Sequence, residues 1–382
     1  MKTRVFEGLG GIPRTLSLVA LGAVLAVPAR AEDIRIGEFA SMTGTTATFG
    51  QSMNNGITLA IDETNGAGGV LGKKIQLLVE DDESKPEEAK TAVIKLIKQQ
   101  KVVALLGEVA SSRSLAAAPE AQHAGIPMVT PASTNPKVTQ IGDYIFRTCF
   151  IDPFQGSTMA KFAHDTLKAN QVAILKDVKN DYSVGLAEFF EKTFTGLGGQ
   201  IVANESYSEG DTEFRAQLTA IRSKSPQAIY VPGYYTEVGL IARTARELGL
   251  KVPLLGGDGW DSDKTLEIGG DAVNGSYYTN HYSAEDPGPA VQNFIQKYKG
   301  KYGAVPDAMA VLGYDAAKIL VDSIKRAGST DGAKIRDALA KTKDYPGVSG
   351  SITIDAERNS QKNIVVLKID GGKVKFQSSI AP

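Results

Sequence analysis

The chain has 382 residues, of which 42% are hydrophobic and 22% are charged, values typical of soluble globular proteins with about two domains. Its 42 basic and 43 acidic residues nearly cancel, which argues against a nucleic-acid partner. The single cysteine, Cys149, excludes an internal disulfide and every multi-thiolate metal site, and three histidines leave little material for a histidine-based metal centre.

The first 31 residues are typical of a cleavable signal peptide. Basic residues precede an apolar run at residues 16–27, and small side chains occupy positions 29 and 31 before the expected cleavage after Ala31. The apolar run is shorter than the roughly 20 residues that a membrane span needs. No cysteine lies near the cleavage point to accept a lipid. We therefore expect a periplasmic protein without a lipid anchor, and removal of residues 1–31 changes its formal charge from −1 to −4.

After the signal peptide, short β-branched runs alternate with longer amphipathic stretches. The pattern predicts strands at residues 34–37, 74–80, 102–107 and 126–131. It predicts helices at residues 49–64 and 85–99, and another between the last two strands. Strands separated by single helices are typical of a parallel sheet with right-handed crossovers.

From Phe150 the same alternation starts again. It predicts strands at residues 171–176, 200–207, 228–233 and 252–257. The helices of this second run are predicted at residues 155–167, 183–193, 212–221 and 237–248. Two successive runs of this kind indicate an α/β protein with two similar, doubly wound parallel-sheet lobes.

The C-terminal part does not form a third domain in this interpretation. A strand at 273–280 precedes helices at 290–302, 308–327 and 332–339. A short strand at 349–355 follows, and residues 363–376 form a hairpin that turns at Gly371-Gly372. The helices are expected to return to the first lobe and the hairpin to complete a sheet edge. The N-terminal lobe would then comprise residues 32–150 plus 281–355, and the C-terminal lobe residues 151–280 plus 356–382, with chain crossings near residues 150, 280 and 355.

Catalytic motifs are scarce. The chain has no phosphate-binding P-loop and no G-x-S-x-G nucleophile elbow, and the glycine run at 66–72 has the wrong context for a dinucleotide fingerprint. His123, His164 and His281 are each interpreted as structural or surface residues. The acidic turn at residues 80–83 lacks the spacing of a calcium loop. We therefore assign no catalytic residue, no metal and no cofactor.

Small hydroxyl side chains and aromatic rings follow the predicted strands. Ser111 follows the strand at 102–107 and begins a helix, where unpaired N–H groups favour an anion. Taken alone, this serine is more typical of an ordinary helix cap. Thr134 lies in a second hydroxyl-rich turn. The second lobe contributes Tyr182, Tyr234, and Asp258 with Trp260. These rings and this acid suit an apolar side chain and an ammonium group, with core packing as the alternative for the tyrosines.

Several segments resemble, in order along the chain, the periplasmic solute-binding proteins of branched-chain amino acid ABC transporters. The resemblance runs from about Asp33 to the C-terminus and rests on IRIGEFASMTGTTATFGQSMNNGITLAIDETNGAGGVLGKK, GEVASSRS, IPMVTPASTNP, DYSVG and LLGGDGWDS. It implies a type I periplasmic binding fold, in which two α/β lobes joined by three hinge strands close on a ligand.

The resemblance also implies how the polar ends of an amino acid are held. Ser111 would bind the ligand carboxylate through its hydroxyl and backbone N–H, and the Thr134 N–H would add a bond. The ammonium group would meet the Ala132 carbonyl, the Thr134 hydroxyl and the Asp258 carboxylate. Some relatives carry glutamate where this chain has Asp258, which leaves open whether Asp258 contacts the ammonium directly or through water. Some carry a disulfide-bonded cysteine where this chain has Ala110.

Aromatic residues would complete the binding site. By the same resemblance, Tyr182 and Tyr234 close on the ligand from the second lobe, Phe49 helps to wall the side-chain pocket, and Trp260 narrows it. The leading hypothesis is a monomeric, non-catalytic protein that captures an amino acid, with aliphatic or branched-chain residues favoured, and delivers it to an inner-membrane ABC permease. The alternatives are a different ligand (an amide, a polar amino acid or an aromatic acid), a sensor for a membrane receptor, and a periplasmic hydrolase, for which no activated nucleophile is evident.

Overall fold

The computed structural model describes Met1, Gly11 and residues 32–382. The chain divides into a unit that ends at Glu32 and a second unit, Asp33–Pro382, which contains all the described helices and strands. The expected signal peptide, residues 1–31, lies outside the described residues except for Met1 and Gly11. No helix in the described part of the chain is long and apolar enough to cross a membrane.

The first sheet has five strands, all parallel. In spatial order they are β2 (Ile75–Asp81), β1 (Ile34–Ala40), β3 (Ala104–Leu106), β4 (Met128–Thr130) and β5 (Ile145–Arg147). This 2-1-3-4-5 order reverses direction between β1 and β3, and a reversal of this kind opens a crevice at the carboxyl ends of the strands.

The second sheet repeats that order and extends it. Its strands are β7 (Gln200–Tyr207), β6 (Gln171–Asp177), β8 (Ala228–Tyr230), β9 (Leu254–Gly256), β10 (Ser276–Asn280), β14 (Ile364–Asp370) and β15 (Lys373–Ile380). The first five are parallel, whereas β14 and β15 are antiparallel and form the edge. The predicted C-terminal hairpin, with its turn at Gly371-Gly372, therefore lies where the sequence placed it, at a sheet edge.

A small antiparallel sheet lies, along the chain, between β10 and β14 of the second sheet. It contains β11 (Tyr345–Gly347), β12 (Gly350–Ile354) and β13 (Ser360–Gln361). The chain passes between the large sheets after β5, after β10 and before β14. We place the third crossing at residues 362–363, because β13 still pairs with β12.

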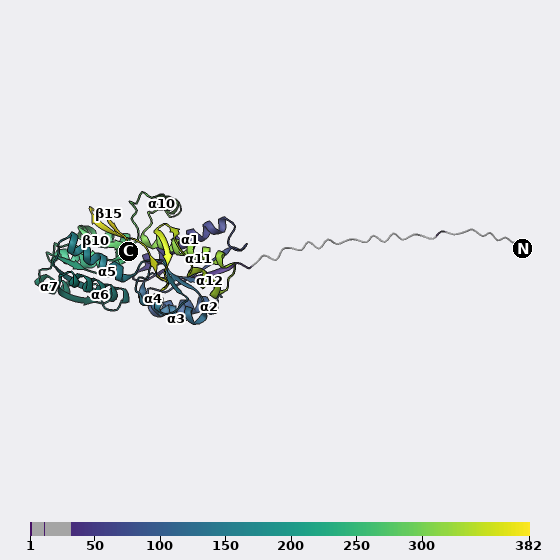
Figure 1. The fold of residues 1–382 in the computed structure, drawn as a ribbon, viewed down its shortest axis with the longest axis horizontal. Coiled ribbons are helices and arrows are strands. Elements are labelled where there is room, and N and C mark those ends of the chain that lie inside the picture. The colour runs from purple at the N-terminus through teal and green to yellow at the C-terminus, as the bar shows by residue number, and fades with distance from the viewer. Residues whose placement is uncertain (2–10, 12–31) are drawn as a thin grey trace. The chain divides into compact units, whose positions relative to one another are not determined.

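Helices cover both large sheets and form two groups (Figure 1). The first lobe, defined by the first and third sheets, carries α1 (Ala47–Gly66), α2 (Pro86–Lys98), α3 (Ser111–Ala124), α4 (Lys137–Gln140), α10 (Pro289–Tyr302), α11 (Ala308–Ala327) and α12 (Gly332–Leu339). The second lobe, defined by the second sheet, carries α5 (Asp152–Lys161), which continues as a π-helical turn to Thr166, α6 (Asp181–Gly196), α7 (Arg215–Ser223), α8 (Tyr235–Glu247) and α9 (Asp263–Gly269). Short 3-10 turns occupy Asp258–Trp260 and Gly270–Val273.

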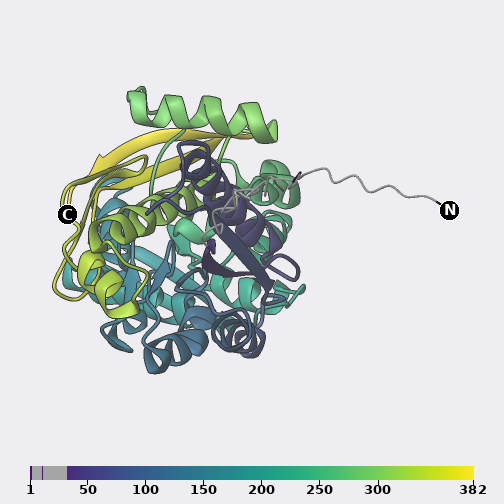
Figure 2. The same ribbon diagram turned by 90° about the vertical axis from the view of Figure 1, so that its right-hand side faces the viewer.

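Both faces of the first sheet are buried at its central strands β3 and β4, which explains why these strands are almost entirely apolar. Along β3, Ala104 and Leu106 pack into the core beneath α1 and α11, while Leu105 packs into the opposite core beneath α2 and α3. Figure 2, which turns the first lobe toward the viewer, shows helices on either side of these strands. A parallel sheet covered on both faces needs apolar side chains at every position, and the prediction of two doubly wound lobes is confirmed.

Most predicted elements are present, with ends that differ by a few residues. The helices α11 and α12 have the predicted bounds. The run at 102–107 yields only a three-residue strand, because Gly107, with φ 122°, turns the chain toward α3. The sequence analysis missed β5 and α9, since three and seven residues are too few to show a clear periodicity.

The first lobe depends on a close approach between α1 and α11. A Cβ atom at Gly56 of α1 would lie 1.9 Å from the Ala310 carbonyl oxygen, and one at Gly313 of α11 would lie 2.5 Å from the Met53 carbonyl oxygen. Both distances are far below van der Waals contact. The two helices can therefore touch backbone to backbone only because glycine occupies both positions.

One buried carboxyl group in this lobe lacks a charged partner. Glu38 on β1 is fully buried, its Oε2 accepts a hydrogen bond of 2.9 Å from Asn54 Nδ2, and its Oε1 has no partner. Burial raises the pKa of Glu38 to about 8, and the Asn54 hydrogen bond only partly opposes this rise. Between about pH 4.5 and pH 8, the Glu38 carboxyl therefore retains a proton in the folded chain that it has released in the unfolded chain.

The helix contact predicts that Gly56→Ala destabilises the protein by about 1–3 kcal/mol, the usual cost of forcing an extra methyl group into a packed core. Gly66→Ala is the matched control, since Gly66 ends the same helix and its Cβ would meet nothing within 4 Å. Urea unfolding of both variants measures the difference. Equal midpoints for the two variants would contradict the close helix approach.

The raised pKa of Glu38 predicts that the free energy of unfolding depends on pH. Between its unfolded pKa near 4.5 and its folded pKa of about 8, the folded state binds more protons than the unfolded state, so the free energy of unfolding falls as pH rises. In Glu38→Gln this titration is gone. The free energy of unfolding should then fall less steeply across this range, by up to about 1.4 kcal/mol per pH unit. Urea titrations at a series of pH values test this, and parallel curves for variant and wild type would refute it.

Candidate ligand-binding site between the lobes

The carboxyl ends of both large sheets face each other, and side chains of the two lobes are hydrogen-bonded across the gap. Ser112 Oγ at the start of α3 donates to Asp181 Oδ2 at 2.9 Å and accepts from the Asp181 backbone N–H at 2.9 Å. Asn135 Nδ2 donates to the Asp181 carbonyl at 2.8 Å. Thr48 N–H at the start of α1 donates to the Tyr235 hydroxyl at 3.2 Å. The two lobes are therefore closed on each other.

In the first lobe, Ser111, Ala132 and Thr134 come together as predicted. All three are at least 96% buried and follow the adjacent strands β3 and β4. Ser111 is the first residue of α3, and the helix cap before it is Ala110, which makes no side-chain cap hydrogen bond. The first-turn N–H groups of α3 therefore lack the side-chain acceptor that serine or aspartate supplies at most helix starts. This terminus suits a carboxylate.

Aromatic rings from both lobes stack beside this helix terminus. Tyr182 and Tyr234 of the second lobe lie nearly parallel, with ring centroids 5.3 Å apart and an interplanar angle of 7°. Phe49 of the first lobe meets Tyr234 edge-on at 5.6 Å and Tyr235 at 4.8 Å. The Tyr182 hydroxyl accepts a hydrogen bond from the Gly259 N–H at 3.2 Å. Three of the predicted aromatic contacts thus form one group that spans the lobes.

Asp258, the predicted ammonium partner, has one occupied and one free carboxylate oxygen. Its side chain is 4% exposed, and Oδ2 lies 2.9 Å from His281 Nε2. Its backbone N–H donates to Gln155 Oε1 at 2.8 Å. Oδ1 is buried and has no hydrogen-bond partner. Since buried polar atoms are nearly always paired, this oxygen is the strongest indication of a bound cationic group.

A second carboxyl group lies on the same side. Asp152, the first residue of α5, is fully buried. Burial raises its pKa to about 8, and the negative charge of Asp258 raises it further. The hydroxyl of Tyr230 is likewise buried without a partner. A cation placed here would stabilise the ionised form of Asp152 as well as Asp258.

Two other acids that could replace Asp258 are already occupied by protein donors. Glu108 Oε1 accepts from the Ser41 hydroxyl at 2.8 Å, and Glu108 Oε2 lies 3.3 Å from Arg113 Nε. Asp261 Oδ1 accepts from the Tyr278 hydroxyl at 2.8 Å, and its Oδ2 accepts from the Ala308 N–H across the lobes at 2.6 Å. Asp258 is thus the acid of these three with an oxygen left for a ligand.

The structure places the Trp260 ring apart from the aromatic group. Its indole Nε1 donates to the Val231 carbonyl at 2.9 Å, and the ring lies against Tyr278 with centroids 6.1 Å apart. A Cβ atom at Gly256 would lie 2.1 Å from the indole, so the ring covers the end of β9. Trp260 belongs to the core of the second lobe, whereas Phe49, Tyr182 and Tyr234 belong to another cluster.

The sequence analysis missed four residues of this region. His281 was interpreted as structural or surface, and Asp152, Gln155 and Tyr230 were not considered. Gln155 Oε1 accepts from the Asp258 N–H and from the Thr279 hydroxyl at 2.8 Å. The position of three of these residues in the predicted elements could have identified them. Tyr230 ends a strand, His281 follows one, and Asp152 begins the helix after the first crossing.

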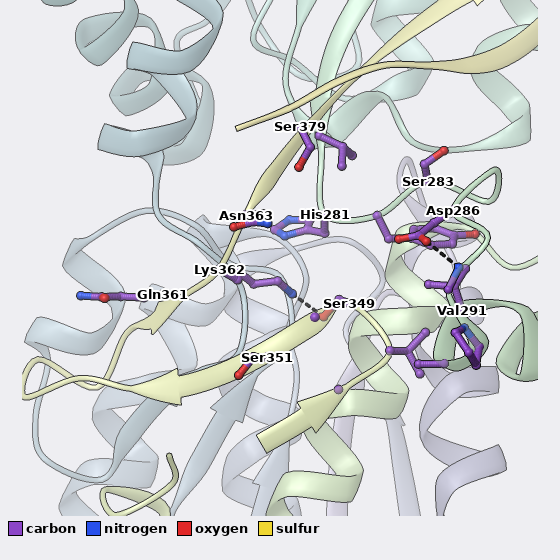
Figure 3. A pocket seen from close by; sticks show the side chains of 18 of the residues that line it. His281, Ser283, Asp286, Val291, Ser349, Ser351, Gln361, Lys362, Asn363 and Ser379 are labelled. Atoms are coloured by element: carbon purple, nitrogen blue, oxygen red, sulfur yellow. Dashed lines mark hydrogen bonds between the residues drawn. The ribbon is translucent and has the colours of Figure 1, made fainter. Parts of the chain in front are cut away.

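Two cavities in the described part of the chain lie beside the predicted site. One of about 1040 Å³ lies at the hinge and is lined by His281, Ser349 and Lys362 among others (Figure 3). Another of about 420 Å³ lies at the rim between the lobes beside Ser52 and Asp261. Of the predicted site residues, Trp260 lines the second cavity, whereas Phe49, Ser111, Ala132, Thr134, Tyr182, Tyr234 and Asp258 line neither.

Comparison with known proteins shows the same architecture. Residues 33–373 match the family described as periplasmic binding protein. A leucine-binding protein, LivK, from Thermotoga maritima is 44% identical and superposes with a TM-score of 0.88, covering 91% of this chain and 99% of that one. The branched-chain amino acid transporter substrate-binding protein LivJ from Streptococcus pneumoniae, in complex with isoleucine, is 33% identical with a TM-score of 0.88 and coverages of 92% and 100%.

A third solved structure carries a different ligand. The solute-binding protein of an ABC transporter from Rhodopseudomonas palustris BisB5, in complex with 3,4-dihydroxybenzoic acid, is 28% identical with a TM-score of 0.82, and the alignment covers 91% of this chain and 96% of that one. Because the family match spans most of the chain and the two-sheet architecture is the same, the chain belongs to the periplasmic binding protein family.

Proposed function

We propose that this protein captures an aliphatic amino acid between its two lobes and delivers it to an inner-membrane ABC permease. The observation that carries the proposal is the buried, unpartnered Oδ1 of Asp258 in the second lobe, and the start of α3 in the first lobe, which has no side-chain cap, supports it. A zwitterion satisfies both ends at once. LivK and LivJ, the first two solved structures described above, are named for leucine and for branched-chain amino acids.

Each end of an amino acid finds a complementary group. In the proposed arrangement the carboxylate accepts bonds from the Ser111 hydroxyl and N–H and from the Thr134 N–H, and the positive end of the α3 dipole adds to the attraction. The ammonium group donates to Asp258 Oδ1, the Ala132 carbonyl and the Thr134 hydroxyl. Charge-assisted bonds contribute about 1.5–3 kcal/mol each, which offsets the cost of removing both charges from water.

The aromatic group determines which side chains fit. Phe49 is fully buried against Tyr234 and Tyr235, so this wall offers apolar surface to an aliphatic side chain. Tyr182 and Tyr234 reach the ligand only when the lobes meet. The proposal therefore favours leucine, isoleucine or valine over polar amino acids and amides.

An aromatic acid is the second candidate ligand. The stacked rings of Tyr182 and Tyr234 and the dihydroxybenzoate complex of the relative from Rhodopseudomonas palustris favour it. Against it, a ligand without an ammonium group leaves the Asp258 carboxylate buried without a counter-charge, and burying an unpaired charge is costly. The amino acid is therefore the better match to this site.

Export and monomeric state form part of the same proposal. A cleavable signal peptide at residues 1–31 would deliver the chain to the periplasm without a lipid anchor, and the mature protein would begin at Glu32. The two lobes contain the whole proposed site, so one copy of the chain suffices for binding. No catalytic role is proposed, since the groups of the site are arranged to bind and not to activate a nucleophile.

The site predicts that Asp258→Asn weakens leucine binding by roughly 30- to 1000-fold, equivalent to about 2–4 kcal/mol, because a buried ammonium loses its counter-charge. Ser111→Ala should weaken binding less, since its backbone N–H remains. Calorimetry with leucine and with 4-methylpentanoate, its deaminated analogue, measures both effects. The deaminated acid should bind Asp258→Asn at least as well as wild type. An affinity of Asp258→Asn for leucine within threefold of wild type would show that the ammonium site lies elsewhere.

Closure of the lobes predicts a change of shape in solution. Because the site is formed by residues of both lobes, saturating leucine should decrease the radius of gyration measured by small-angle X-ray scattering, as hinge closure requires. Asp258→Asn at the same leucine concentration is the control and should keep the ligand-free scattering curve. A wild-type curve that does not change at saturating leucine would disprove binding between closing lobes.

A further inference from the structure

The carboxylate of Asp258 is held by a single side chain, that of His281. Their atoms Oδ2 and Nε2 lie 2.9 Å apart, and the two side chains are 4% and 0% exposed. The Asp258 backbone is fixed separately by the hydrogen bond from its N–H to Gln155. With the backbone and one oxygen held, the other oxygen, Oδ1, has a defined direction. This is the oxygen that has no protein partner.

His281 is itself fixed by the hinge. It directly follows β10, in the second crossing between the lobes. Its ring stacks on Phe150 of the first crossing, with centroids 3.7 Å apart and an interplanar angle of 16°. It also lines the hinge cavity together with Lys362 of the third crossing (Figure 3). The imidazole therefore lies where all three crossings meet, and its orientation depends on them.

The imidazole acts as a neutral donor. Burial lowers the pKa of His281 to about 4, and the positive charge of Lys362 lowers it further, while the hydrogen bond and charge of Asp258 oppose this. The ring atom Nδ1 is buried without a partner, which suits an unprotonated nitrogen, since a buried N–H without an acceptor is costly. The proton therefore resides on Nε2, which donates to Asp258 Oδ2.

We propose that His281 is a positioning residue for the ammonium end of the ligand. Its hydrogen bond to Oδ2 sets the rotation of the Asp258 carboxylate so that Oδ1 faces the cleft before the ligand arrives. A group that is already ordered loses less conformational entropy on binding. A neutral donor also leaves the full carboxylate charge for the ammonium, which a protonated histidine would cancel. The inference rests on the proposed amino-acid function and assigns a role that the sequence alone did not indicate.

Two variants separate positioning from packing. His281→Phe keeps a ring that can stack on Phe150 but removes the donor. His281→Gln loses the ring but keeps an N–H donor on a side chain of similar reach. We expect His281→Phe to weaken leucine binding about 10- to 100-fold, in line with one charge-assisted bond, and to leave 4-methylpentanoate binding unchanged or tighter. His281→Gln should recover most of the leucine affinity. Calorimetry on purified full-length mature protein measures both ligands.

A double-mutant cycle with Asp258→Asn tests whether the two residues act together. If His281 acts through Asp258, then adding His281→Phe to Asp258→Asn should change leucine affinity by less than about threefold, because coupled residues are not additive. Independent effects that multiply would overturn the proposal. An equal loss of affinity for leucine and for its deaminated acid in His281→Phe would also overturn it, since that result indicates a general effect on the hinge.

Leucine binding by the wild-type protein distinguishes a failure of the proposed function from a failure of the proposed role of His281. Wild-type protein that binds no aliphatic amino acid refutes the proposed function and, with it, the role of His281. Wild-type protein that binds leucine, with His281→Phe at wild-type affinity, refutes the positioning role alone. Thermal unfolding of each variant shows that it is folded, and a folded His281→Gln without recovered affinity counts against the proposal.

Discussion

A buried carboxylate with one unsatisfied oxygen organises the cleft. Asp258 lies at the end of β9 with Oδ2 bonded to His281 and Oδ1 unpaired. Taking a charged group out of water is costly unless hydrogen bonds or a counter-charge replace the lost hydration. Within the described residues the chain supplies only part of that compensation, and a ligand ammonium would supply the rest. The same argument extends to Asp152, whose pKa is raised to about 8 by burial and by the charge of Asp258.

The architecture explains how Asp258 comes to lie near the proposed carboxylate-binding residues, which are more than a hundred residues away in sequence. The parallel strands of each large sheet follow the order 2-1-3-4-5, so each sheet opens its crevice at the same point of its topology. The two crevices face each other, and hydrogen bonds such as those between Ser112 and Asp181 close them. The start of α3, capped by Ala110, then lies on one side and Asp258 on the other. Three hinge crossings join the lobes, and His281 links the hinge to the site.

Much of the fold follows from local pattern. The apolar runs that form β3 and the centre of β6 are buried on both faces, and the helices α11 and α12 begin and end where their periodicity does. The pattern failed for β5 and α9, which are too short to show a period. The local pattern does not show which way the Trp260 ring turns, because this residue lies in a short 3-10 turn. The structure places the ring against Tyr278, in the core of the second lobe.

The sequence by itself determined the alternating α/β order, the two repeated lobes and the hydroxyl, aromatic and acidic residues at the strand ends, because these depend on local periodicity and on the rule that parallel strands present their carboxyl ends together. Only the tertiary structure decided which of three acids keeps a free oxygen. Glu108 and Asp261 are satisfied by Ser41 and by Tyr278, partners distant in sequence, and no local pattern predicts such pairs. His281 is the clearest case. Its neighbours Phe150, Asp258 and Lys362 come from separate segments that converge at the hinge, so its role arises from the packing of three chain crossings.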